Sequence, residues 1–198
     1  MDAVVYDIEI IKAIQGKNED RLEGIEYCNG WHDHEGMGIS VIGAYDFVED
    51  RYRTFCEDNI TEFLALVDNR KVRISFNGVG FDDKVINSCI TCGVSLLKDH
   101  YDILREIWLH RGLNPDRFNW RTHGGFGLDA MCQANGLGGK TGNGALAPVQ
   151  WQRGQIGSVI DYCLQDIKLT KDLFVLSQQG KIKSPKGGEL LLRRIENA

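Results

Sequence analysis

The segment from Val4 to Ile11 limits most strongly what this chain can fold into. It reads Val-Val-Tyr-Asp-Ile-Glu-Ile-Ile, so every residue except two acids is apolar or aromatic, and most are β-branched. A short apolar run of this kind is typical of a strand that is covered on both faces, as in the sheet of an α/β domain. We therefore predict a central buried strand. The presence of two acids inside such a strand requires a physical explanation.

Those acids, Asp7 and Glu9, stand two positions apart, so on a strand their side chains leave the same face. Two ionised carboxylates side by side in a buried strand are stable only if one is protonated or a cation lies between them. Ligand sets made of oxygen atoms favour Mg²⁺ or Mn²⁺. Alone the pair is weak evidence, because an Asp-x-Glu triplet often arises by chance in chains of average composition.

The rest of the pattern predicts a mixed sheet flanked by helices, which is the α/β class. Strands are expected over residues 39–47, 51–56 and 72–76, and helices over 59–67, 81–92, 103–110, 128–134 and 158–176. We expect Asn59 and Ser158 to cap two of these helices, and Gly93 to end a third. Residues 12–36 and 136–144 are predicted to be loops, the second of them mobile because it holds five glycines.

The length of 198 residues suits one buried core, so we expect a single domain over residues 1–180 and a basic tail over 181–198. Residues 190–194 of the tail are expected to form a short helix or a partner-binding segment. No apolar stretch approaches the roughly 20 residues that cross a bilayer, and no secretory signal is recognisable, so we expect a cytoplasmic protein without a membrane span. The six cysteines are then expected to stay reduced, and Cys89 and Cys92 supply only half of a zinc site.

The net charge of -5 argues against broad, nonspecific wrapping of nucleic acid. It does not exclude an enzyme that acts on nucleic acid, because bound divalent cations would neutralise an acidic site where the substrate approaches. Basic segments that hold a strand are then expected at residues 70–73, 111–121 and 181–186.

A second motif follows the strand predicted over residues 72–76 and reads Asn-Gly-Val-Gly-Phe-Asp from Asn77 to Asp82. Strand ends in α/β sheets are where binding sites form. The glycines let a ligand approach the backbone, Phe81 offers a ring for stacking, and Asp82 in the first helical turn is expected to point toward the sheet. Taken alone, Asp82 is better explained as a helix-capping acid that interacts with the helix dipole.

A third motif, Tyr-Cys-Leu-Gln-Asp, lies on the helix predicted over residues 158–176. Tyr162 and Asp166 are four positions apart, so they share a face of this helix, next to its apolar stripe. Such a position suits a site at the edge of a core. In isolation, a surface aspartate and a half-buried core tyrosine explain the pair equally well.

Together the three motifs resemble, in order and spacing, the DEDDy branch of the DEDD exonucleases, which includes the proofreading domains of family B DNA polymerases. The resemblance spans about residues 3–176. It implies a ribonuclease-H-like fold and two divalent cations, Mg²⁺ or Mn²⁺. By the same resemblance, Asp7, Glu9, Asp82 and Asp166 bind the metals, Tyr162 orients the attacking water, and Asn77, Phe81 and Ile8 contact the substrate.

The resemblance further implies a 3′–5′ exonuclease that acts on single-stranded nucleic acid, DNA in preference to RNA, and releases nucleoside 5′-monophosphates. No polymerase domain is present, so we expect a free-standing nuclease or a subunit that acts with a protein partner or a second copy. Two alternatives stay open. One is a structure-selective endonuclease with the same carboxylates, and the other is a catalytically silent module for nucleic-acid binding or assembly.

Overall fold

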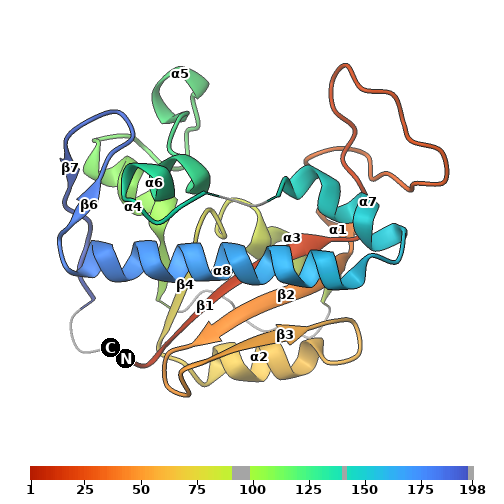
Figure 1. Ribbon diagram of the computed structural model, residues 1–198, viewed down its shortest axis with the longest axis horizontal. Helices are drawn as coiled ribbons and strands as arrows, with labels where there is room; N and C mark the ends of the chain where they lie inside the picture. Colours follow the sequence, from red (N-terminus) through yellow and green to blue (C-terminus); the bar gives the residue numbers. More distant parts are fainter. Residues whose placement is uncertain (91–98, 140–141, 196–198) are drawn as a thin grey trace.

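The computed structural model, which describes residues 1–90, 99–139 and 142–195, contains a five-stranded sheet in the order β3-β2-β1-β4-β5 (Figure 1). The strands are β1 Ala3–Ile10, β2 Ile39–Asp46, β3 Arg51–Phe55, β4 Val72–Ser75 and β5 His100–Asp102. β1, β2 and β3 pair antiparallel, whereas β4 pairs parallel with both β1 and β5. The predicted α/β class with a mixed sheet is confirmed.

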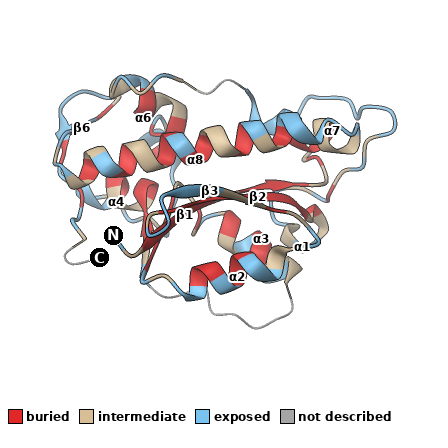
Figure 2. Cartoon of the chain, turned by 60° about the horizontal axis from the view of Figure 1, so that its bottom comes forward, coloured by how far each residue is buried: buried red, intermediate tan, exposed pale blue. Residues whose placement is uncertain are grey.

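Helices cover both faces of this sheet (Figure 2). Helix α8, Ile156–Gln178, lies along one face, and α2, Ile60–Asp68, and α3, Asp82–Cys89, lie against the other. Side chains of β1 alternate between the two layers: Val5 belongs to the apolar core that includes α8, and Val4 belongs to the core under α2 and α3. Because of this alternation, the odd-numbered residues of β1 emerge on the face of α8.

The remaining elements are short. They are α1 His34–Met37, α4 Ile103–His110, α5 Trp120–His123, α6 Leu128–Ala134, a 3-10 turn Gly144–Leu146, α7 Ala147–Gln152, β6 Ile182–Lys183 and β7 Glu189–Leu190. The helices predicted over residues 103–110 and 128–134 are confirmed. The elements that were not predicted are α1, β5, α5, the 3-10 turn, α7, β6 and β7. Within the described part of the chain, no helix combines the length and apolar character that a bilayer crossing requires.

Two predicted helix caps are wrong. The side chain of Asn59 does not cap α2, because its Oδ1 accepts a hydrogen bond from the backbone N–H of Cys56 at 2.7 Å, in the turn before the helix. Ser158 lies inside α8, which begins two residues earlier at Ile156. The helix predicted over residues 81–92 is shorter than expected: α3 ends at Cys89, since Ile90 is already extended, and the predicted cap Gly93 lies outside the described residues.

The short helix considered for residues 190–194 does not form. Leu190 ends strand β7, and Leu190 and Leu192 are buried in the same core as α8. The hydroxyl of Tyr101 donates a hydrogen bond to the backbone oxygen of Arg193 at 2.9 Å, which holds this segment extended against the domain. Burial of alternate residues therefore favours an extended segment over a helix here.

Two of the three basic side chains in the segment expected at residues 70–73 are not available to nucleic acid. Arg70 donates two hydrogen bonds to the buried carboxylate of Asp46, at 2.8 and 2.6 Å. Arg73 is only 2% exposed, because Val72–Ser75 is an inner strand of the sheet. These two guanidinium groups belong to the fold, which leaves Lys71 as the exposed basic side chain of this segment.

Candidate active site

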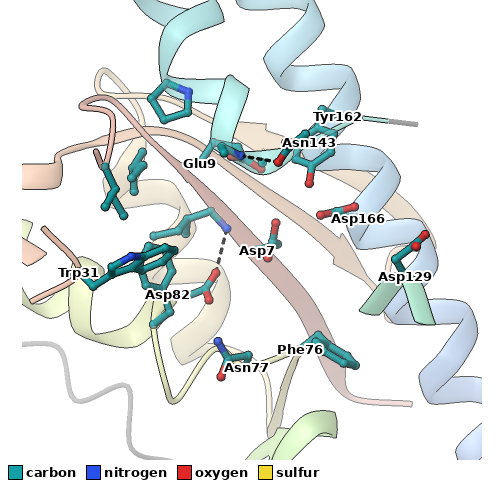
Figure 3. Close-up of a pocket in the computed structure, with 18 residues that line it drawn as sticks. Asp7, Glu9, Trp31, Phe76, Asn77, Asp82, Asp129, Asn143, Tyr162 and Asp166 are labelled. Atoms are coloured by element: carbon teal, nitrogen blue, oxygen red, sulfur yellow. Dashed lines mark hydrogen bonds between the residues drawn. The ribbon is translucent and has the colours of Figure 1, made fainter. Parts of the chain in front are cut away.

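A pocket of about 620 Å³ lies over the carboxyl end of β1 and brings the three sequence motifs together (Figure 3). Its lining includes all eight residues singled out from the sequence, namely Asp7, Ile8, Glu9, Asn77, Phe81, Asp82, Tyr162 and Asp166. In the view of Figure 3 the carboxylate of Asp7 lies between those of Asp82 and Asp166. Residues from β1, from the start of α3 and from α8 therefore share one cavity.

The acids of β1 lie closely against helix α8. Oxygen atoms of Asp7 and Glu9 and the sulfur of Cys163 lie within 4.8 Å of one another. Burial, and then the charges of Asp7 and Glu9, raise the pKa of the Cys163 thiol well above its ordinary value, so the thiol stays neutral. A neutral thiol does not ligate hard cations such as Mg²⁺. The carboxylates, and not the sulfur, are therefore the candidate metal ligands of this cluster.

Asp82 joins the second motif directly to the first. Its Oδ1 accepts a hydrogen bond from the backbone N–H of Ile8 at 3.0 Å. That N–H is available because β1 pairs with β4 only from Ala3 to Val5. The carboxylate of Asp82 therefore does not act as the side-chain cap of α3, whose N-cap residue is Phe81.

Full burial gives Asp82 an unusual titration. Desolvation raises the pKa of Asp82 from 3.8 to about 7, with smaller contributions from the charges of Asp83 and Asp102, while the Ile8 N–H opposes the shift. A nearby divalent cation would reverse the effect, because it stabilises the ionised carboxylate. The donor set thus fits a hard divalent ion: several carboxylates converge on one cavity, and one of them is hard to ionise without a cation.

The raised pKa of Asp82 predicts that the metal-free protein loses stability with rising pH. The contribution of the protonated group is fully present below 3.8 and is lost as the pH rises through about 7. Over that pH interval, the free energy of unfolding is expected to fall by on the order of 4 kcal/mol. Urea unfolding in the presence of a chelator, from about pH 4 to about pH 8, measures it.

The matched comparison uses two Asp-to-Asn variants. Asp82→Asn removes the titration, so we expect its stability to fall less steeply with pH than that of the wild type. Asp161→Asn, an exposed acid on α8, is expected to keep the wild-type slope. An equal slope in the wild type and in Asp82→Asn would contradict the assigned pKa shift.

Helix α8 presents Tyr162 and Asp166 to the pocket, and both are buried. The Tyr162 ring packs against the end of the glycine-rich loop: a Cβ on Gly142 would lie 2.8 Å from Tyr162 Cδ2, and one on Gly144 would lie 3.2 Å from its hydroxyl. Larger side chains there would displace the phenol. This contact also places Asn143 at the pocket wall.

Asp102, which was not predicted, shapes the second motif. Its Oδ1 accepts a hydrogen bond from the N–H of Asn77 at 2.9 Å, and its Oδ2 accepts one from Val79 at 3.1 Å. Asn77 has a positive φ of 68°, a conformation that asparagine tolerates better than most residues. Asp102 also caps α4. The sequence signal that could have identified Asp102 is its position directly before the helix predicted over residues 103–110.

Three further residues of the pocket escaped prediction. Asp129 at the start of α6 and Asn143 line it, and so does Trp31 from the predicted loop over residues 12–36. The Trp31 ring meets the ring of Phe81 edge to face, with centroids 6.1 Å apart. Two loops predicted from composition thus contribute to the pocket wall, although no residue pattern in them indicated it.

Asp83, next to Asp82, belongs to a separate network. It accepts a hydrogen bond from the Tyr6 hydroxyl, and its Oδ2 lies 3.0 Å from His100 Nδ1. His100 Nε2 lies 2.7 Å from Ser75 Oγ, so the order Ser-His-Asp matches that of a nucleophilic triad. Ser75 is only 1% exposed, however, so substrate has no access to it. The network is structural, and it ties β1, β4 and β5 together.

The order and directions of the five strands, with helices on both faces, define an α/β domain of the ribonuclease-H-like fold. The fold is similar to that of the family B DNA polymerase from the hyperthermophilic archaeon Pyrobaculum calidifontis, with a TM-score of 0.59 and 15% sequence identity. The match covers 89% of this chain and 24% of the polymerase chain. This chain thus spans about a quarter of the polymerase's length. No family model and no curated protein match the chain.

Proposed function

We propose that the pocket over β1 is the active centre of a metal-dependent 3′–5′ exonuclease of the DEDDy type. One observation carries the proposal: four acids and a tyrosine from three distant segments line a single cavity. They occur in the order and spacing that the resemblance to this family requires. The similarity to a family B DNA polymerase supports the proposal at the level of the fold.

The proposed chemistry follows from the donor set. Asp7, Glu9, Asp82 and Asp166 would hold two divalent cations, Mg²⁺ or Mn²⁺. When bound, such ions supply a hydroxide nucleophile at neutral pH and stabilise the departing oxyanion. Tyr162 would orient the attacking water through its hydroxyl, since its ring is fixed against the glycine-rich loop. Hydrolysis of the terminal phosphodiester would release a nucleoside 5′-monophosphate.

The aromatic pair at the pocket wall supports a single-stranded 3′ end as the proposed substrate, and the preference for DNA over RNA rests on the family resemblance alone. Phe81 and Trp31 form an aromatic pair at one wall, which suits stacking against the terminal base. Asn77 and Ile8, the other substrate contacts that the resemblance implies, also line the pocket. A paired end would have to be separated before its last base could enter a cavity of this size.

Incubation of end-labelled single-stranded DNA and RNA with Mg²⁺ or Mn²⁺ tests the proposed function. We expect stepwise shortening from the 3′ end, mononucleotide products and no reaction with a chelator present. Circular DNA and strands blocked at the 3′ terminus are the controls. Equal cleavage of these substrates would favour the endonuclease alternative, and no cleavage of any substrate would favour a silent binding module.

Replacing Tyr162 by phenylalanine tests the role of the hydroxyl. The ring contact with Gly142 is kept, so we expect a lower kcat, by on the order of a hundredfold, with unchanged Mn²⁺ affinity. Tyr52→Phe, at a partly exposed position on the edge strand β3, is the matched control and should retain full activity. Equal activity of the two variants would show that the Tyr162 hydroxyl has no part in the reaction.

A further inference from the structure

A second cavity, of about 660 Å³, adjoins the proposed active centre, and we call it the aromatic cavity. Asn77 lines both cavities, which makes them neighbours along the second motif. The other walls come from the rest of the second motif, from Lys84 of α3, from α4 and from residues 115–127, the segment around α5. That segment projects from the domain above the sheet (Figure 1), and no step of the proposed reaction uses it.

His123 orders this segment although little of it is regular secondary structure. The imidazole is buried, and its Nδ1 accepts a hydrogen bond from the backbone N–H of Asn119 at 3.2 Å. Nε2 therefore carries the proton and donates to the backbone oxygen of Asn114 at 3.0 Å. The Trp108 indole packs against the imidazole, with ring centroids 5.0 Å apart, and its Nε1–H donates a hydrogen bond to the His123 backbone oxygen. These contacts of His123 fix the conformation of the segment that forms this wall of the aromatic cavity.

Two aromatic side chains of this wall are largely exposed to solvent. Trp120 is 77% exposed and Phe118 is 61% exposed, although both line the cavity. Large exposed aromatic residues grouped at a cavity commonly mark a binding surface. Flat rings at such a surface offer stacking faces for nucleic-acid bases of any sequence.

The charge around the aromatic cavity is positive, in contrast to the net charge of the chain, -5. Among the described residues that line it, Asp116 is the one acid, and it forms an ion pair with Arg105 at 2.9 Å. Lys84 also lines the cavity and is exposed. Phe126 is another wall residue, and two cations lie over its ring. Arg111 Cζ is 5.9 Å and Lys186 Nζ is 4.5 Å from the ring centroid. Two of the basic segments expected from the sequence therefore meet here.

We propose that the aromatic cavity binds the nucleotides that precede the 3′-terminal one, by stacking bases on Trp120 and Phe118. The surrounding Lys and Arg side chains would contact the phosphates. This inference rests on the proposed function, since it places the substrate strand across both cavities. The shared residue Asn77 provides the continuity between the terminal nucleotide and the upstream strand.

The test measures how affinity depends on strand length. Fluorescence anisotropy compares a thymidine dinucleotide with an oligothymidylate of about ten nucleotides, in an Asp7→Asn background that leaves the probes intact. We expect the longer strand to bind more tightly, and Trp120→Ala to lose roughly 5- to 100-fold in affinity for it. Replacing Lys84 and Lys186 by glutamine should reduce the dependence of binding on salt concentration.

Leu191→Ala and Arg51→Gln are the matched controls, because both residues are exposed and distant in sequence from the cavity walls. They should bind the longer strand like the parent chain. Equal affinity of Trp120→Ala and Leu191→Ala for that strand would overturn the inference, and so would equal affinity of the parent chain for both probes. Thermal unfolding checks that each variant is folded.

Hydrolysis of the same longer strand by the chain with Asp7 intact separates this inference from the proposed function. Hydrolysis together with Trp120-independent binding would refute the aromatic cavity as a strand site and leave the exonuclease standing. Binding that depends on Trp120 without any hydrolysis would refute the exonuclease and leave the strand site standing.

Discussion

Replacing Asp7 or Asp166 by asparagine is expected to reduce hydrolysis of single-stranded DNA by on the order of a thousandfold or more. Loss of one group that stabilises transition-state charge already costs about 10²- to 10³-fold. A weakened metal site additionally loses the nucleophile. Asparagine keeps the volume of aspartate, so the fold should be retained, and one fewer acid in a crowded site should leave the metal-free protein at least as stable.

Asp161→Asn is the control for this prediction. Asp161 lies on the same helix α8 as Asp166, but it is exposed and does not line the pocket. Its replacement should leave kcat/KM within about twofold of the wild type, as is usual for a surface change far from a site. Rates are measured on end-labelled strands at saturating Mn²⁺. Comparable rates for Asp166→Asn and Asp161→Asn would remove Asp166 from the reaction.

Replacing Gly43 by alanine is expected to damage both stability and activity. Gly43 pairs with Asp7 across β1 and β2, and a Cβ there would lie 2.8 Å from Cys163 Sγ and 3.0 Å from Ile167 Cγ1. Both neighbours are fully buried and have little room to rotate away, so we expect α8 to shift. Overpacking of this kind costs about 1–3 kcal/mol. A displacement of α8 by about 1 Å would also move Tyr162 and lower kcat, by on the order of a hundredfold.

Gly157→Ala is the same substitution as Gly43→Ala, but we expect it to raise stability and to leave activity unchanged. Gly157 lies in the first turn of α8, and a Cβ there meets no atom within 4 Å. Alanine in a helix is more stable than glycine by roughly 0.5–1 kcal/mol, so this variant should gain stability and keep its activity. Urea unfolding and initial rates measure the two effects. If Gly43→Ala had the same stability and the same initial rate as Gly157→Ala, the close approach of α8 to β2 would not be needed.

Long or fully buried elements could be predicted from the sequence because their apolar pattern is strong. β1 begins one residue before the predicted start, and α8 extends two residues beyond its prediction at each end. β5 and α5 could not be predicted in this way. They have three and four residues, too few to show a period. β5 depends on pairing with β4, a contact between residues far apart in the sequence. α5 depends on the side-chain contacts of His123 and on the hydrogen bond that Trp108 donates to its backbone oxygen, which no periodic pattern shows.

The residues of the candidate site were predictable to a similar extent. Each motif occupies the end or the inward face of an element whose type the sequence indicates, so the three motifs could be expected to converge. Asp129, Trp31 and Asn143 line the same pocket but lie in or next to loops without a periodic pattern. Their proximity arises only from the packing of α6 and of the loops beside β1 and α8.

Manganese binding, followed by electron paramagnetic resonance, tests whether the carboxylates over β1 form a metal centre. We predict that the wild-type chain binds Mn²⁺, that Asp7→Asn and Asp166→Asn bind it much more weakly, and that Asp161→Asn binds it like the wild type. If the wild type takes up no Mn²⁺, or if all three variants bind it equally well, then the clustered carboxylates are not a metal centre and the hydrolytic mechanism is wrong.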